Sequence, residues 1–68
     1  MGKSYHSREV IRVLERHGFE LRSVKGSHHK YVKGSFKTIV PHPKKDLKLG
    51  TLKSILELAG LTFGDLEK

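Results

Sequence analysis

Two short glycine-containing turns constrain the fold of this chain more than any other feature. Lys25-Gly26-Ser27 and Gly34-Ser35 each lie between segments in which apolar and polar residues alternate. The segments predicted to be strands cover residues 19–24, 28–33 and 36–40. Because strands joined by such short turns run antiparallel, we expect a three-stranded antiparallel meander. Pro41 and Pro43 end the third strand, since proline cannot donate a hydrogen bond to a neighbouring strand.

An amphipathic helix is predicted on each side of the strands. The first covers residues 8–17, with Ser7 as its N-cap and Gly18 as the glycine that ends it. The second follows Thr51, its predicted N-cap, and ends at Gly60. The apolar residues at helical spacing are Val10, Ile11, Val13 and Leu14 in the first helix and Leu52, Ile55, Leu56 and Ala59 in the second.

The order of these elements, α-β-β-β-α, indicates an α+β fold. Both helices are expected to cover one face of the sheet, and the other face stays open. A last turn, capped by Thr62, is expected to dock Phe63 and Leu66 on the core. We expect one small domain over residues 1–68.

Alternation along the strands assigns side chains to the two faces of the sheet. The residues expected to face the helices are Phe19, Leu21, Tyr31, Thr38 and Val40. The residues expected on the open face are Arg22, His28, Lys30 and Lys37. A one-residue slip in the second strand, or a bulge, would exchange His28 for His29 on that face.

The composition limits the classes of function. With 68 residues, of which 35% are hydrophobic, the core is thin and an internal pocket for a cofactor is not expected. The chain has no cysteine, which excludes disulfides, cysteine zinc sites and thiol nucleophiles. No apolar run approaches the roughly 20 residues of a membrane span, and we expect a cytoplasmic protein. Asn and Gln are absent, and this depletion of thermolabile residues points to a thermophilic source.

The charge balance favours a polyanionic partner. Lys and Arg number 14 against 7 Asp and Glu, which gives a formal net charge of +7. This positive potential attracts nucleic acid most strongly and an anionic membrane surface less so. The alternative is that the charge only keeps the domain soluble. Because Asn and Gln, the usual readers of adenine, are missing, we expect weak base specificity.

The segment Gly26-Ser27-His28-His29 gives the strongest indication of chemistry. Successive N–H groups of a glycine turn can form an anion nest that accepts a phosphate. A histidine beside the nest, with Lys25 and Lys30 nearby, suits RNA strand scission, in which the ribose 2′-OH is the nucleophile and the imidazole moves its proton. No metal or cofactor is required, and adjacent histidines on opposite sides of a regular strand do not form a joint metal site. The alternative is a β-turn followed by two solvent-exposed histidines.

Several motifs follow one another along almost the whole chain. They are Ser7-Arg8-Glu9-Val10, Gly18-Phe19, Lys25-Gly26-Ser27-His28, Val40-Pro41 and the segments 47–52 and 55–60. With these motifs the chain resembles the HicA toxins, small mRNA interferases of toxin–antitoxin pairs. The resemblance implies a double-stranded-RNA-binding-domain-like fold, a catalytic role for His28 and neutralisation by a HicB antitoxin.

The residues and the resemblance together predict a metal-independent endoribonuclease that cuts single-stranded mRNA by proton transfer at His28. The residues expected to hold the RNA backbone are Arg22, Lys25, Gly26, Ser27, Lys30, Lys37, Lys44 and Lys45. His42, held between two prolines, is a further candidate as the acid partner of His28. The alternatives are a non-catalytic RNA-binding domain and an interaction module whose basic face docks an acidic partner.

Overall fold

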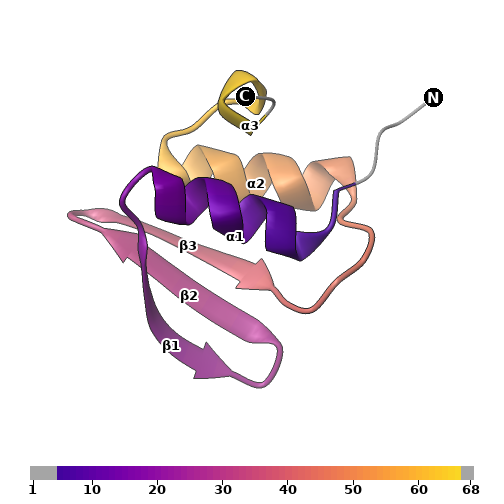
Figure 1. Cartoon of the computed structure of the whole chain (residues 1–68), viewed down its shortest axis with the longest axis horizontal. Helices are drawn as coiled ribbons and strands as arrows, with labels where there is room; N and C mark the ends of the chain where they lie inside the picture. The colour runs from indigo at the N-terminus through magenta and orange to yellow at the C-terminus, as the bar shows by residue number, and fades with distance from the viewer. Residues whose placement is uncertain (1–4, 67–68) are drawn as a thin grey trace.

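The chain folds as a helix, three strands and a second helix, followed by one short helical turn (Figure 1). In this computed structural model the described residues are 5–66, so the two ends of the predicted domain, residues 1–4 and 67–68, lie outside them. The elements are α1 (Ser7–Arg16), β1 (Glu20–Lys25), β2 (His28–Lys33), β3 (Phe36–Pro41), α2 (Leu49–Ala59) and α3 (Phe63–Leu66). The strands form one antiparallel sheet in the order β1-β2-β3, and α1 and α2 lie on the same side of it. The predicted α+β class and element order are confirmed.

The N-terminus of α1 differs from its predicted form. Its N-cap is His6, whose Nδ1 accepts the Arg8 N–H at 3.0 Å, while the His6 N–H donates to Oε1 of Glu9 at 2.8 Å. The prediction of Ser7 as the cap is wrong, because Ser7 is the first residue of the helix and is fully buried. Its hydroxyl accepts the N–H of the distant Lys44 at 2.9 Å, so it is occupied by the tertiary structure and does not cap the helix.

The glycines that end the helices are confirmed, but the start of α2 is not. Gly18 and Gly60 have positive φ values of 95° and 72°, which glycine adopts without steric cost. The prediction of Thr51 as the N-cap of α2 is wrong. The N-cap is Lys48, whose carbonyl accepts the Leu52 N–H at 2.9 Å and so closes the first turn three residues earlier. No side chain caps this end of the helix.

The core lies between the helices and the part of the sheet formed by β2 and β3. The helix α2 packs chiefly on β3, and α1 also contacts that strand. Among these packed residues Thr38 is buried and polar, and its Oγ1 donates to the Ile55 carbonyl of α2 at 2.9 Å. The buried apolar side chains are Tyr5, Val10, Val13, Leu14, Phe19, Tyr31, Val40, Leu47, Leu52, Ile55, Leu56, Ala59 and Leu66. The predicted apolar faces of both helices are therefore confirmed, with Ile11 partly buried against this cluster.

Two predicted core residues are exposed. Leu21 is 50% exposed because the helices pack chiefly on β3, and β1 lies at the opposite edge of the sheet. Phe63 is 39% exposed, and α3 docks instead through Leu66, which is 7% exposed. The other residues predicted to face the helices, Phe19, Tyr31, Thr38 and Val40, are buried as expected.

The register of β1 against β2 contains one irregularity. Leu21 pairs with Tyr31 and Ser23 with Lys30, so Arg22 is an extra residue in β1 and forms a bulge. The pairing of β2 with β3 is regular from His28 to Lys33. The bulge therefore lies in β1 and leaves the alternation of β2 intact.

Candidate functional site

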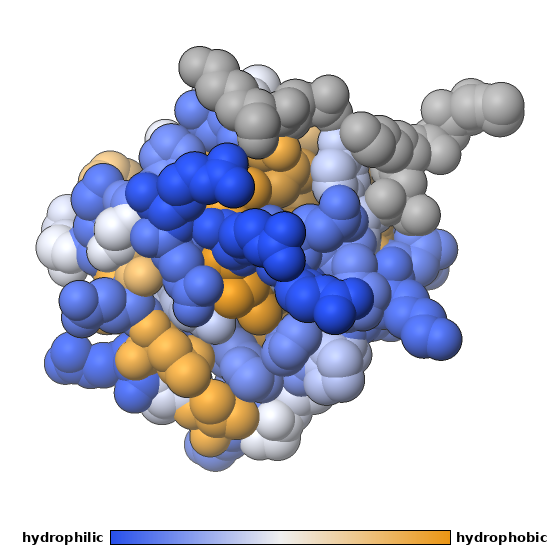
Figure 2. All heavy atoms as spheres, in the orientation of Figure 1, coloured by the Kyte–Doolittle hydropathy of each residue, from blue (hydrophilic) through white to orange (hydrophobic). Residues whose placement is uncertain are grey.

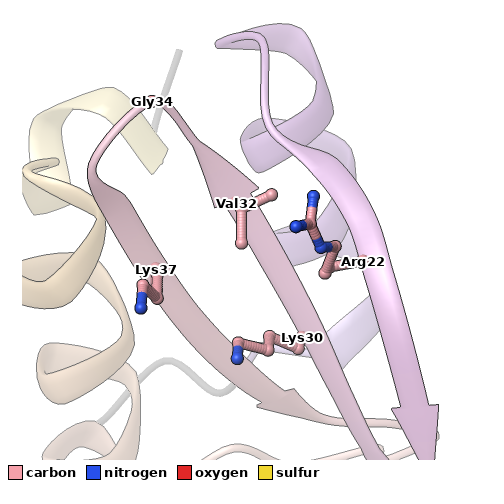
Figure 3. A pocket seen from close by; sticks show the side chains of 5 residues that line it. All are labelled: Arg22, Lys30, Val32, Gly34 and Lys37. Atoms are coloured by element: carbon pink, nitrogen blue, oxygen red, sulfur yellow. The ribbon is translucent and has the colours of Figure 1, made fainter.

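The open face of the sheet carries a basic hollow. It is lined by Arg22 of β1, Lys30 and Val32 of β2, Gly34 of the second turn and Lys37 of β3 (Figure 3). Three cations from three strands gather here with no carboxylate among the lining residues. The structure thus brings together Arg22, Lys30 and Lys37, three of the residues predicted to hold RNA. A hollow with this charge suits the phosphate groups of a polyanion.

His28 lies at one end of the same face. It is the first residue of β2 and is exposed, with Lys25 opposite it on β1 and Pro41 opposite it on β3. Directly opposite residues share a face of the sheet and bring their Cβ atoms to about 5 Å of each other. The alternation of β2 also puts His28 on the side of Lys30 and away from buried Tyr31. The imidazole therefore stands beside Lys25 on the open face, where a bound polyanion can reach it.

The turn before His28 has an open backbone. Gly26 has a φ of 60°, and no atom lies within 4 Å of the position that a Cβ would occupy there. The carbonyl of Ser27 accepts the backbone N–H of His42 at 2.7 Å, which ties the turn to the segment after β3. The missing Cβ of Gly26 leaves this side of the turn backbone open. The anion nest expected here stays a prediction.

A strap of three residues, 42–44, connects that turn to the start of α1. The Lys44 N–H donates to Ser7 Oγ at 2.9 Å, and the Ser7 N–H donates to the Lys44 carbonyl at 2.8 Å. Ser7 Oγ lies 2.6 Å from Nδ1 of His42. The hydroxyl accepts from Lys44 and shares a hydrogen bond with Nδ1 of His42, whose direction depends on the tautomer of the imidazole. Ser7 is thus the buried residue that fixes the strap.

His42 belongs to a histidine cluster on the helix side of the sheet. Its ring lies 5.0 Å from that of His29 and 6.4 Å from that of His6, both in edge-on contact. Burial lowers the pKa of His42 below its ordinary value, and the charges of His29, His6 and Arg8 lower it further. His42 was predicted as an acid partner of His28. The structure shows no contact between them, since His42 packs against His29 on the face of the sheet opposite to His28.

The remaining predicted RNA-binding residues are divided by the structure. The backbone of Lys44 is fixed by Ser7, and its exposed side chain lies in the strap that is bonded to the Gly26-Ser27 turn. Lys45 is exposed in the loop before α2, with no contact that places it beside the hollow. Ser7 was expected only to cap a helix, and His29 was named in the sequence beside His28 but was given no partner on the helix side of the sheet. The alternation of the second strand could have indicated that His29 faces the helices. The hydrogen bonds of Ser7 could not be predicted, because they join residues that are 35 and 37 positions apart in the sequence.

Within residues 5–66 no three His, Asp or Glu side chains are arranged to hold a metal ion. The histidine cluster is therefore a set of ring contacts and not a ligand set. No helix in the described part of the chain has the length and apolar character required to cross a membrane.

Comparison with known proteins gives one result that agrees with this geometry. The model of the family described as the HicA toxin of bacterial toxin–antitoxin matches residues 7–61, from the first residue of α1 to the residue after Gly60. No curated protein matched the chain. The matched segment contains the turn, His28, the hollow and the strap. The chain belongs to the HicA toxin family and is the toxin of a toxin–antitoxin pair.

Proposed function

We propose that this toxin is a metal-independent endoribonuclease that cuts single-stranded mRNA, with His28 in proton transfer. The observation that carries the proposal is the position of His28. It is exposed on the same face as the hollow formed by Arg22, Lys30 and Lys37, at the end where the open Gly26 turn lies. An RNA strand bound along this face would contact the cationic side chains of the hollow and, at one end of the hollow, the imidazole of His28.

The chemistry requires one base and a stabilised phosphorane. His28 takes the proton of the ribose 2′-OH, and the 2′-oxygen attacks the adjacent phosphorus. The bond from phosphorus to the 5′-oxygen breaks, and that oxygen takes a proton from water. The products are a 2′,3′-cyclic phosphate and a 5′-hydroxyl. Lys25, across from His28, and the N–H groups of the turn offset the charge that develops on the phosphoryl oxygens.

The cognate antitoxin of the pair is proposed to be a HicB-like protein that covers the open face. A toxin with a net charge of +7 offers its lysines and arginines to an acidic surface as readily as to RNA. Such a partner excludes RNA and covers His28 in one step.

The test compares RNA cleavage by the wild type, His28→Ala and His17→Ala. His17 follows α1 at the opposite end of the helix from the strap and serves as the matched histidine control. We expect His28→Ala to lower the cleavage rate about 10²–10⁴-fold, the contribution of a positioned acid–base group, and His17→Ala to leave it unchanged. Equal rates for the wild type and His28→Ala would remove His28 from the mechanism.

Two further arms examine the chemistry. Cleavage is expected to persist in excess EDTA, and an RNA with one 2′-deoxyribose at the cut position is expected to resist cutting there. Wild-type protein that binds RNA without cleaving it would favour the alternative, a non-catalytic RNA-binding domain.

A further inference from the structure

The strand β1 lies outside the cover of the helices. All six of its residues are exposed, and Leu21 and Val24 retain 50% and 53% of their accessible surface. Figure 1 shows β1 as the edge of the sheet farthest from α2, and Figure 2 shows apolar surface over the region where β1 runs. An edge strand with apolar side chains and one row of unpaired peptide groups is a template for another strand.

The bulge at Arg22 arranges the side chains of this edge in a particular way. Leu21 is opposite buried Tyr31 and Val24 is opposite His29, so both point to the helix side of the sheet. Residues three apart in a regular strand would point to opposite faces. The extra residue restores them to one face and puts Glu20 and Lys25 together on the other, since these pair with Val32 and His28.

This order of residues is complementary to itself. If two β1 strands pair antiparallel about a two-fold axis between Arg22 and Ser23, Leu21 of each lies across from Val24 of the other. Glu20 of each then lies across from Lys25 of the other. Opposite charges and apolar pairs directly across a strand pair are both favourable. A two-fold axis perpendicular to the sheet requires paired residues to share a face, and the bulge satisfies that requirement for both pairs.

From this we infer that a second copy of this chain docks on β1 and joins the two sheets into one of six strands. The order of charged and apolar residues along β1 is complementary to the same strand in the reverse direction. Binding of an acidic partner would not require this self-complementary order. The axis leaves the open faces of both copies on the same side. Two basic hollows then lie along one continuous surface, so a dimer presents a longer track to a polyanion than one chain does.

The test is sedimentation velocity of the purified chain in about 0.5 M salt, which screens the mutual repulsion of two bodies of charge +7. We expect a concentration-dependent dimer for the wild type. Glu20→Lys and Lys25→Glu each bring like charges together at both ends of the strand pair, and each is expected to weaken the dimer about tenfold or more. Val24→Asp is expected to weaken it as well. Glu57→Lys and Lys53→Glu, on exposed positions of α2, make the same charge changes elsewhere and serve as matched controls.

Two combinations decide the geometry. The double variant carrying both Glu20→Lys and Lys25→Glu is expected to regain the wild-type dimer, because each pair is only reversed. A mixture of the two single variants is expected to form a 1:1 heterodimer, because one copy then carries a lysine at both positions and the other copy a glutamate at both. A wild type that stays monomeric up to about 1 mM would overturn the proposal. Single variants that do not associate better when mixed would overturn it too.

Discussion

The two edges of the sheet differ in how they are used. At the β3 edge, Thr38 and Val40 are buried under α2, and a hydrogen bond joins Thr38 to the helix backbone. At the β1 edge every residue is exposed and no helix covers the strand. The residues proposed to act on RNA lie mostly in the β1–β2 hairpin, whereas most of the buried side chains lie in β3 and the helices. In this small domain the covered edge of the sheet thus supplies most of the packing, and the uncovered hairpin holds most of the residues proposed to act on RNA.

The strongest test of this division compares two leucines. Leu52 on α2 is fully buried and Leu21 on β1 is half exposed. Leu52→Ala is expected to lower the free energy of unfolding by about 2–5 kcal/mol, and Leu21→Ala by no more than about 0.5 kcal/mol. Because a core of this size contributes roughly 3–5 kcal/mol, the first variant is expected to be largely unfolded. Circular dichroism without denaturant measures the folded fraction of each variant, and denaturant titration gives the stability of the variant that remains folded. Equal losses would mean that β1 is part of the core.

A second test concerns the hydrogen bonds by which Ser7 joins the start of α1 to the strap. Ser7→Ala removes the acceptor for the Lys44 N–H and the partner of His42, and leaves both groups in part-buried surroundings. We expect a loss of about 1–3 kcal/mol in the free energy of unfolding. Ser54→Ala, at an exposed position of α2, is the matched control and is expected to change little.

The rate of RNA cleavage by folded Ser7→Ala tests whether the strap also positions the Gly26-Ser27 turn. The strap holds the Gly26-Ser27 turn through His42, so its release is expected to slow RNA cleavage even at temperatures where the variant remains folded. Unchanged cleavage by the folded variant would show that the turn is fixed without the strap.

The third test measures the charge of the hollow. Lys30→Gln and Lys37→Gln are each expected to reduce the slope of log K against log salt for single-stranded RNA by about 0.7, the contribution of one phosphate contact. Lys53→Gln, on α2, lowers the net charge equally but lies outside the hollow, and its slope is expected to match the wild type. A slope lowered as much by Lys53→Gln would mean that binding responds to net charge and not to the hollow.

The smallest expected effect is a pH dependence of stability. The pKa of His42 is lowered in the folded chain from its ordinary value of 6.5, chiefly by burial. The unfolded chain therefore binds this proton at higher pH, so the free energy of unfolding is retained above pH 6.5 and falls as the pH drops through that value. Denaturant titrations at several pH values check this, and His42→Gln is expected to show a smaller fall. His17→Gln serves as the control, and a fall of the same size in both variants would assign the effect to another group.

The parts of the structure that could be predicted from sequence depend on local patterns. Two glycine turns determine an antiparallel meander, and spacing identifies the buried faces of α1 and α2. The regular alternation of β2 was enough to put His28 and Lys30 on one face. These features need only near neighbours in the chain.

The parts that could not be predicted depend on tertiary contacts. Alternation treats Leu21 as a core residue, but its exposure follows from where α1 and α2 come to lie. The bulge at Arg22 leaves no mark in an alternating pattern. Ser7 has the residue type and the position expected of an N-cap. Only the folded structure shows that its hydroxyl is hydrogen-bonded to His42 and Lys44, which lie 35 and 37 residues away in the sequence.

The end of α2 has a consequence for how this sequence can vary. A Cβ at Gly60 would lie 2.8 Å from Cε1 of Phe36, and the backbone there has a φ of 72°. Any side chain at position 60 therefore collides with the aromatic ring at the start of β3 unless that ring is lost or moved. Positions 36 and 60 are expected to vary together among relatives, with residues other than glycine at 60 accompanied by smaller side chains at 36. In an alignment of the family, the contact between the start of β3 and the end of α2 would then be visible as covariation of these two positions.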